Sequence, residues 1–401
     1  MLPKEIFVYK LSSSGSRKYT KQWYNLEILR WDKKVNVNHI TDVKEFKKDN
    51  SNFITLNLHE TYDFIEWLNR ELVDLINDDV TKLIIDFANE GLVRESWFFP
   101  IHRMIKKYKI KSSKIYFISC DIKLSENYDT WIEKYNVPKI NIIELNRYLE
   151  EAKLWIEDID KFPIEDFKVD RIREKKYLCL NGSYREHRII IVSELFRNDL
   201  ETDGYISFVG NYGEDPLIKW EIENVDKNLI KYYKDIIYPK IPIKVELEKD
   251  IEVIDPYMSL NYVHEMYTNS YFNIITETAY NWDSSSIIGN NIYLTEKTLK
   301  SIFGMQPFIV VTNPGFLKYL KSMGFKTYPE FIDESYDEIE NPIERMNIIV
   351  REIQKICILG IKELRDRYYN IFDKLEHNRN RLIEIVDDRK MNYGNYLDVF
   401  E

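Results

Sequence analysis

Short apolar runs alternate with longer helical patterns along most of the chain, and this alternation constrains the fold more than any other feature. In the first half, five runs predict strands, at residues 6–10, 53–58, 82–87, 114–120 and 140–145. Stretches with helical spacing lie between them, at 62–76, 97–108 and 146–156. Strands separated by helices are typical of βαβ units, which form a parallel sheet with helices on its faces. We therefore expect an α/β fold.

The same rhythm returns in the second half after a break. Residues 155–173 are charged, contain Pro163 and interrupt the alternation, which indicates a linker. Further strands are predicted at 177–180, 205–209, 243–247, 272–276 and 308–311, and helices at 188–198, 295–302 and 314–323. From 341 to about 388 the apolar residues recur at helical spacing. The predicted division is an N-terminal domain at 1–155, a linker at 156–174, a second domain at 175–340 and a helical segment at 341–401.

Residues 291–300, Asn-Ile-Tyr-Leu-Thr-Glu-Lys-Thr-Leu-Lys, combine a polar loop with a helix start. Thr295 is a candidate N-cap, because its hydroxyl can accept an amide hydrogen of the first turn. Glu296 and Lys297 then lie in that turn, where backbone amides favour an anion. A carboxylate can hold sugar hydroxyls, and an ammonium can hold a diphosphate. The segment therefore favours a nucleotide-sugar site.

The run from Tyr293 to Lys297, Tyr-Leu-Thr-Glu-Lys, resembles the Tyr-Val/Ile-Thr-Glu-Lys signature of the α1,3-fucosyltransferases, which are glycosyltransferases of the GT-B fold. In that family the tyrosine, glutamate and lysine contact the GDP-sugar donor. The resemblance therefore implies donor contacts from Tyr293, Glu296 and Lys297.

Two upstream segments resemble further parts of the same family. Residues 272–279, Phe-Asn-Ile-Ile-Thr-Glu-Thr-Ala, resemble its Phe-Glu-Asn-Ser strand and loop, with Thr278 and Ala279 in place of asparagine and serine and with a longer spacer. Residues 177–188 resemble its strand, Ser-Asn loop and helix-start arginine, which pairs with the donor pyrophosphate. Arg188 matches that arginine best by position, and Arg185 is a close competitor. The resemblance covers 177–337, and the first half shows no matching motif.

The resemblance implies two Rossmann-like domains facing across a cleft, with the donor on the second. Open α/β sheets bind ligands at the carboxyl ends of their strands. It also implies an inverting, metal-independent transfer without a cofactor, in which Arg188 and Lys297 stabilise the departing diphosphate. Enzymes of this fold often end in a helix that crosses back to the first domain, a role open to 381–401. The one Asp-x-Asp, Asp158 to Asp160, lies in the predicted linker and not after a strand, so no metal site is expected.

An inverting transfer needs a carboxylate base in the acceptor domain. Glu90 follows a predicted strand in the run Ile-Ile-Asp-Phe-Ala-Asn-Glu-Gly and is the first candidate. Asp86, Asp121 and Glu95 are its rivals. Glu277, at the end of another strand, has two open roles: binding sugar hydroxyls or supporting the structure.

Composition limits the alternatives. With 401 residues, 44% hydrophobic and 14% aromatic, the chain can build two cores. Its net charge of −10 disfavours a broad nucleic-acid-binding face. Three cysteines without a CxxC motif fit a reducing compartment. No apolar run reaches the roughly 18–20 residues that span a membrane.

These features predict a cytoplasmic transferase, from a bacterium or virus, that acts on a glycan or another hydroxyl acceptor. Two other readings stay open. One is a phage or viral enzyme that glycosylates DNA bases, and the other is a non-catalytic nucleotide-binding or structural protein on the same scaffold.

Overall fold

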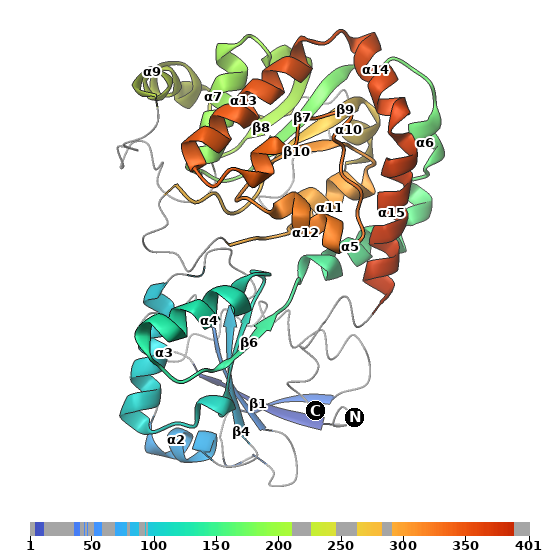
Figure 1. Cartoon of the computed structure of the whole chain (residues 1–401). Helices are drawn as coiled ribbons and strands as arrows, with labels where there is room; N and C mark the ends of the chain where they lie inside the picture. The colour runs from blue at the N-terminus through green and yellow to red at the C-terminus, as the bar shows by residue number, and fades with distance from the viewer. Residues whose placement is uncertain are drawn as a thin grey trace. The chain divides into compact units, whose positions relative to one another are not determined.

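The chain forms two compact units (Figure 1). The computed structural model describes residues 5–11, 36–40, 44, 46, 52–57, 69–77, 81–87, 93, 95–210, 226–245, 263–282 and 291–388. The first unit contains the described residues up to Arg147 together with 291–293 and Asp388, and the second contains those of Tyr148–Trp282 and Leu294–Asp387. The division thus falls before the helix α5 (Tyr148–Glu157), whereas the sequence suggested a boundary after residue 155.

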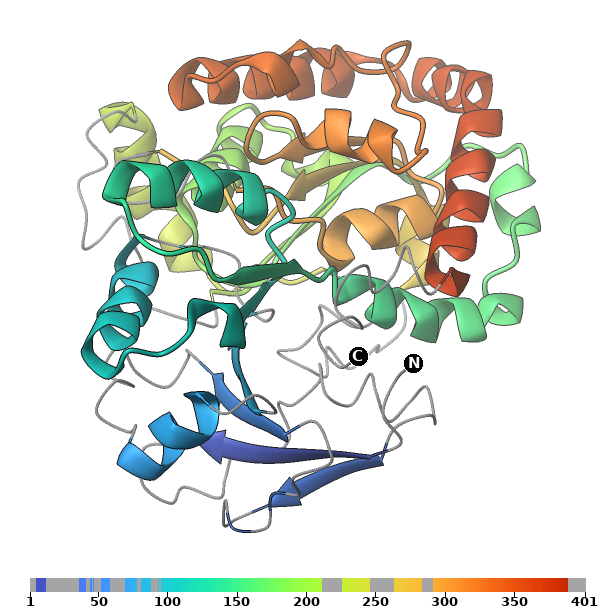
Figure 2. The same cartoon turned by 60° about the horizontal axis from the view of Figure 1, so that its bottom comes forward.

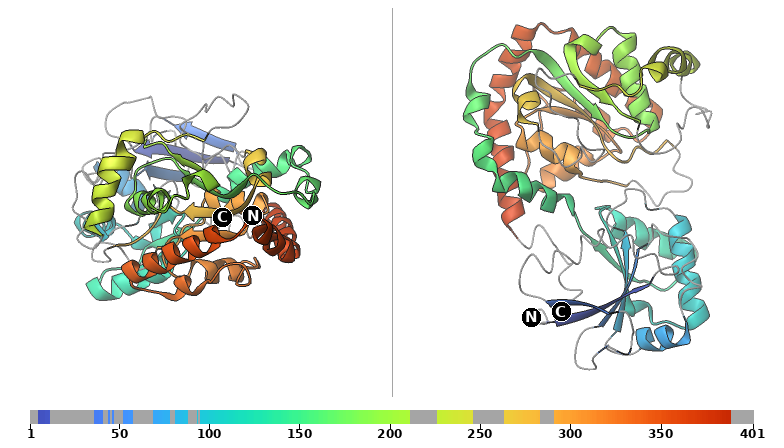
Figure 3. Two further views of the ribbon diagram at one scale, coloured as in Figure 1. Left: turned by 90° about the horizontal axis from the view of Figure 1, so that it is seen from above. Right: turned by 180° about the vertical axis from the view of Figure 1, so that it is seen from behind.

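The first unit is built on a parallel six-stranded sheet in the order β2-β1-β3-β4-β5-β6. The strands are β1 (Glu5–Leu11), β2 (Asn36–Ile40), β3 (Asn52–Asn57), β4 (Thr81–Phe87), β5 (Ile115–Ser119) and β6 (Asn141–Glu144). The helices α2 (Arg70–Asn77), α3 (Glu95–Tyr108) and α4 (Leu124–Tyr135) lie on one side of it, as Figures 1 and 3 show from opposite directions.

Strand periodicity explains this placement of the helices. Leu83, Ile85 and Phe87 alternate along β4 and pack in one buried cluster with Phe98 of α3 and Tyr128 of α4. Because successive strand side chains point to opposite faces, these three residues share one face of the sheet, and α3 and α4 pack on that face.

The second unit contains a parallel four-stranded sheet in the order β10-β9-β7-β8 (Figure 2). Its strands are β7 (Lys175–Asn181), β8 (Gly204–Phe208), β9 (Ser270–Thr276) and β10 (Phe308–Val311). Besides α5, its helices are α6 (Glu165–Lys168), α7 (Glu186–Arg197), α9 (Lys227–Tyr232), α10 (His264–Thr268), α11 (Glu296–Phe303), α12 (Phe316–Ser322), α13 (Pro342–Ile358), α14 (Ile361–Asn370) and α15 (Phe372–Asp387).

The predicted α/β class is confirmed, since both sheets are parallel and helices separate most of the described strands. Two details differ. The strand β2 was not predicted, because Asn-Val-Asn-His-Ile lacks an apolar run; it lies at the edge of the sheet. Instead of a strand at 243–247, Ile243 forms an isolated antiparallel bridge with Phe208, and residues 246–247 lie outside the described ranges.

The predicted linker carries structure of its own. It contains a short 3-10 helix, Ile159–Lys161, and α6, whose Phe167 is fully buried. Helices near the end of the chain hold it: Arg379 of α15 donates to the Phe162 carbonyl, and Tyr369 of α14 donates to the Val169 carbonyl at 2.6 Å. The segment is therefore packed on the second unit.

No described helix is long and apolar enough to cross a membrane.

Gly204 gives a stability prediction for the second sheet. It pairs with Tyr177 across β7 and β8, and a Cβ atom at this position would lie 2.3 Å from the tyrosine ring. Tyr177 is fully buried and donates to the Leu200 carbonyl at 2.8 Å, so the ring has little room to move. We expect Gly204→Ala to destabilise the protein by about 2 kcal/mol.

Urea unfolding of the variant would measure this loss. Gly360→Ala is the matched control, because a Cβ atom there meets no described heavy atom within 4 Å. Equal unfolding midpoints for the two variants would contradict the predicted steric clash.

Candidate functional site

The loop from β7 to α7 carries two arginines. β7 ends at Asn181 and α7 begins at Glu186, with Arg185 as its N-cap residue. Arg188, in the first turn, is only 4% exposed; its Nη1 donates to the Ser183 hydroxyl at 2.8 Å and to the Ser183 carbonyl at 3.2 Å. Within the described ranges, the Nε atoms of Arg185 and Arg188 have no hydrogen-bond partner.

The charge of Arg188 is poorly compensated. Burial, and then the neighbouring Arg185 guanidinium, lowers the pKa of Arg188 to about 9, against the opposing effect of Glu296 and Glu277. The guanidinium therefore remains mostly protonated at neutral pH. In the part of the chain that the structure describes, no carboxylate forms an ion pair with it. A buried cation without a paired anion costs free energy, so this position favours an anionic ligand.

The end of β9 supplies the residue that holds α11 in place. Glu277 is fully buried, and its carboxylate accepts four hydrogen bonds. Oε1 accepts from the Thr298 hydroxyl at 2.7 Å and the Thr295 amide at 3.3 Å. Oε2 accepts from the Thr295 hydroxyl at 2.6 Å and the Thr278 amide at 3.2 Å. Of the two roles left open by the sequence, these contacts favour the supporting one.

The first turn of α11 brings a carboxylate and an ammonium together. The predicted N-cap is confirmed, because the Thr295 hydroxyl accepts from the Lys297 amide. Lys297 Nζ lies 2.9 Å from Glu296 Oε1 and 3.1 Å from Thr295 Oγ1. Burial opposes ionisation of Glu296, but the Lys297 and Lys300 ammonium groups hold its pKa below the ordinary value.

The two cation-bearing segments meet around His187 and Glu296. Burial, followed by the charges of Arg188, Arg185 and Lys297, lowers the pKa of His187 well below its usual value, so the ring is neutral. His187 Nε2 donates to the Glu277 carbonyl at 2.8 Å, which joins α7 to the end of β9. Glu296 acts on Arg188 and is paired with Lys297. We call Arg185, Arg188 and Lys297 the cationic cluster; it lies in the second unit.

Tyr293 differs from the other predicted donor residues, because it belongs to the first unit. It is buried and follows two residues held by Asp121, whose carboxylate accepts from the Asn291 side chain and from the Ile292 amide at 3.1 Å. The donor contact expected from Tyr293 stays a prediction.

The four candidate bases differ in their surroundings. Glu90 lies outside the described residues. Burial raises the pKa of Asp121 to about 7, and its carboxylate anchors the chain at 291–292. Glu95 accepts from Tyr135 at 3.2 Å and pairs with Lys134 at 3.3 Å. Asp86 is buried in β4, one residue before the end of the strand.

Three residues that contact or act on the candidate site residues were not predicted. Ser183 orients Arg188, Thr298 binds Glu277, and Lys300 acts on Glu296. The spacing of Thr298 and Lys300 from Thr295 and Glu296, three and four residues, is a signal that places each pair on one helix face. Burial, and then the effect of Lys297, lowers the pKa of Lys300 to about 8, while Glu296 raises it.

Similarity to known proteins is confined to solved structures. No family model and no curated protein matches the chain. The chain is similar to an α,α-trehalose-phosphate synthase (UDP-forming) from Burkholderia vietnamiensis, with 9% identity, a TM-score of 0.47 and coverage of 96% of this chain and 99% of that one. A glycosyltransferase from Rickettsia africae has 13% identity, a TM-score of 0.40 and coverage of 99% and 97%. An α1,3-fucosyltransferase with GDP has 8% identity, a TM-score of 0.33 and coverage of 99% and 89%.

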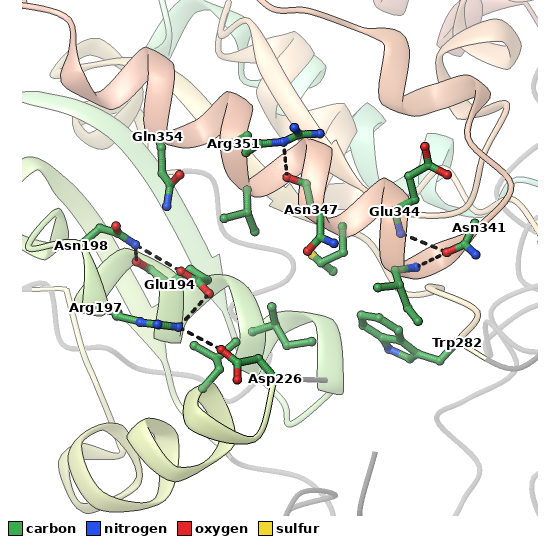
Figure 4. Close-up of a pocket in the computed structure, with 15 residues that line it drawn as sticks. Glu194, Arg197, Asn198, Asp226, Trp282, Asn341, Glu344, Asn347, Arg351 and Gln354 are labelled. Atoms are coloured by element: carbon green, nitrogen blue, oxygen red, sulfur yellow. Dashed lines mark hydrogen bonds and ion pairs between the residues drawn. The ribbon is translucent and has the colours of Figure 1, made fainter. Parts of the chain in front are cut away.

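A groove of about 800 Å³ lies elsewhere on the second unit, between α7, α9 and α13. Figure 4 shows Trp282 and Asn341 at one end and Asn198 and Gln354 at the other. None of the predicted site residues lines it. The cationic cluster, and not this groove, is therefore the candidate site.

No set of three or more potential metal-ligating side chains gathers within the described ranges. Asp158, from the one Asp-x-Asp motif, pairs with Lys161 at 2.8 Å instead. Transfer without a metal stays a prediction.

Proposed function

We propose that the chain is a glycosyltransferase that binds a nucleoside-diphosphate sugar at the cationic cluster and moves the sugar to an acceptor hydroxyl. One observation carries the proposal: Arg188 is buried with Nε unpartnered, and Glu277 binds both the helix start that carries Arg188, through His187, and the helix start that carries Lys297, through Thr295. Cations from two segments at the first turns of two helices suit a diphosphate, which is doubly charged and extended.

The chemistry follows from the charge that develops on the leaving group. When the sugar–phosphate bond breaks, negative charge grows on the diphosphate. Arg188 can stabilise this negative charge with the planar hydrogen-bond donors of its guanidinium, and Lys297 can stabilise it with the point charge of its ammonium. Since both groups are already in place, the transition state gains stabilisation without reorganisation of solvent. Lys297 binds Oε1 of Glu296. Oε2 of the same carboxylate can accept a hydrogen bond from a sugar or ribose hydroxyl.

The remaining steps rest on the resemblance to the α1,3-fucosyltransferases. It supports a GT-B arrangement, inversion at the anomeric carbon and Tyr293 as a further donor contact. An inverting transfer also needs a base that deprotonates the acceptor, and position after a predicted strand makes Glu90 of the first unit the first candidate, with Asp86 as a rival. The motif supports a nucleotide-sugar more strongly than it supports fucose. GDP-fucose is therefore the first donor to test, not the only one.

Thermal unfolding with GDP-, UDP-, ADP- and CMP-sugars tests the binding half of this proposal. A ligand that binds only the folded state raises Tm. At a ligand concentration of one hundred times its Kd, it adds about 2.7 kcal/mol to the free energy of unfolding. We expect one nucleotide class to raise Tm and to be turned over when acceptor sugars are supplied. If no class raises Tm, the proposed function is wrong.

A nucleotide-binding protein without turnover is the second candidate. It is favoured by one observation: of the candidate bases, Asp121 and Glu95 are already engaged in contacts within the first unit. Release of nucleoside diphosphate separates the two. A protein that is stabilised by a nucleotide-sugar but releases none, with or without acceptors, belongs to this second class.

A further inference from the structure

The contacts of Glu277 extend beyond its own helix cap. Its side chain binds α11, its carbonyl accepts from His187 of α7, and its amide donates to the Val311 carbonyl at 3.1 Å. One residue thus connects β9 and β10 with the first turns of the two helices that carry Arg188 and Lys297. Since Glu277 is fully buried and its carboxylate is occupied, it has no oxygen to offer a ligand.

We propose that Glu277 is a positioning residue that sets the place of the Lys297 ammonium through the hydroxyl of Thr295. This inference rests on the proposed function, because it concerns how the cationic cluster meets a diphosphate.

Hydrogen-bond direction supports the link. Lys297 presents only donors to Thr295 Oγ1, from its amide at 3.4 Å and from Nζ at 3.1 Å. The oxygen must therefore accept from Lys297, and its single proton must point elsewhere. It points to Glu277 Oε2, which lies 2.6 Å away and can only accept when the carboxylate is charged. Glu277 thus orients the hydroxyl so that its lone pairs face Lys297.

The same geometry predicts the effect of removing the charge. Oε1 faces the Thr295 amide and Oε2 faces the Thr278 amide, and neither backbone group can accept a hydrogen bond. In Glu277→Gln the new NH₂ group must therefore oppose one backbone N–H, whichever way the side-chain amide turns. The variant keeps the shape of the residue but loses one acceptor next to Thr295: either the one that orients its hydroxyl or the one that holds its amide.

The test measures binding of the nucleoside diphosphate, GDP, UDP, ADP or CDP, that raises the Tm of the wild-type protein most. We expect Glu277→Gln and Thr295→Val to weaken its binding about tenfold each. Thr298→Val is the matched control: it also removes a hydroxyl that donates to Glu277, but this hydroxyl makes no contact with Lys297 in the described structure. Its binding should stay within about threefold of wild type. Thr295→Ser, which keeps the hydroxyl, should restore most of the affinity.

A double-mutant cycle separates positioning from general support. In a Lys297→Met background, Glu277→Gln should weaken binding further by less than about twofold, because the group that it positions is already gone. An equal tenfold loss in both backgrounds would overturn the inference, as would wild-type affinity in Glu277→Gln. If Glu277→Gln does not fold, the same cycle with Thr295→Val decides. A wild-type protein that binds none of the four nucleotides would instead refute the proposed function itself, and this inference with it.

Discussion

Replacing Arg188 with methionine is expected to lower kcat/KM for sugar transfer by about 10²–10³-fold, the usual cost of removing one donor that stabilises developing charge. The side chain is 4% exposed, and in the described structure its only hydrogen bonds are those from Nη1 to Ser183. Lys297 cannot replace this two-pronged contact with a phosphate, because its ammonium is a point charge.

The same substitution should leave the ligand-free protein at least as stable. Burial and the neighbouring Arg185 lower the pKa of Arg188, because both disfavour the charged form of the side chain. Methionine removes that charge and keeps much of the volume. The expected result is an unchanged or higher Tm without nucleotide, together with loss of the nucleotide-induced rise in Tm.

Arg197→Met is the matched control on the same helix. Arg197 is 43% exposed in its side chain and pairs with Asp226 at 3.4 Å, at the end of α7 away from the cluster. It should retain both activity and nucleotide binding. A destabilised Arg188→Met protein that still binds nucleotide would reverse the argument, since Arg188 would then serve the fold and not the ligand.

Lys297→Met should lower kcat/KM by about 10²-fold and weaken binding of the free nucleoside diphosphate. The ammonium is held between Glu296 and Thr295, so its position is set before any ligand arrives. Loss of Lys297 also leaves Glu296 without its nearest cation, and the buried carboxylate would then repel a diphosphate. Steady-state kinetics and isothermal titration measure the two effects.

Two variants sharpen this second result. Lys297→Arg keeps the charge but not the compact ammonium geometry, and we expect it to recover only part of the activity. Lys321→Met removes an exposed lysine that pairs with Glu334 outside the cluster, so it should behave as wild type. Activity of Lys297→Met equal to that of Lys321→Met would exclude Lys297 from the donor site.

The helix start at Thr295 is a feature that neighbouring residues alone could predict. A threonine followed by Glu-Lys-Thr was enough to predict the N-cap, because capping depends on residues within one turn. The strand cores were predictable for a similar reason, since apolar alternation is read over a few positions. The edge strand β2 was missed, because its residues lack that signal.

Glu277 shows what local sequence could not decide. As a carboxylate at the end of a strand, it fitted a ligand contact as well as a supporting role. Its four donors come from Thr278, Thr295 and Thr298, and the last two lie 18 and 21 residues further along the chain. Asp121 is similar: its binding to residues 291–292 joins segments about 170 residues apart.

The sequence by itself determined the α/β class, most strands and the start of α11, because these depend on periodicity and on contacts within a helical turn. Only the tertiary structure decided that Glu277 is already occupied, and that it binds the helix starts that carry Arg188 and Lys297. Long-range packing brings such groups together, and burial then sets their charges. Neither effect can be read from neighbouring residues alone.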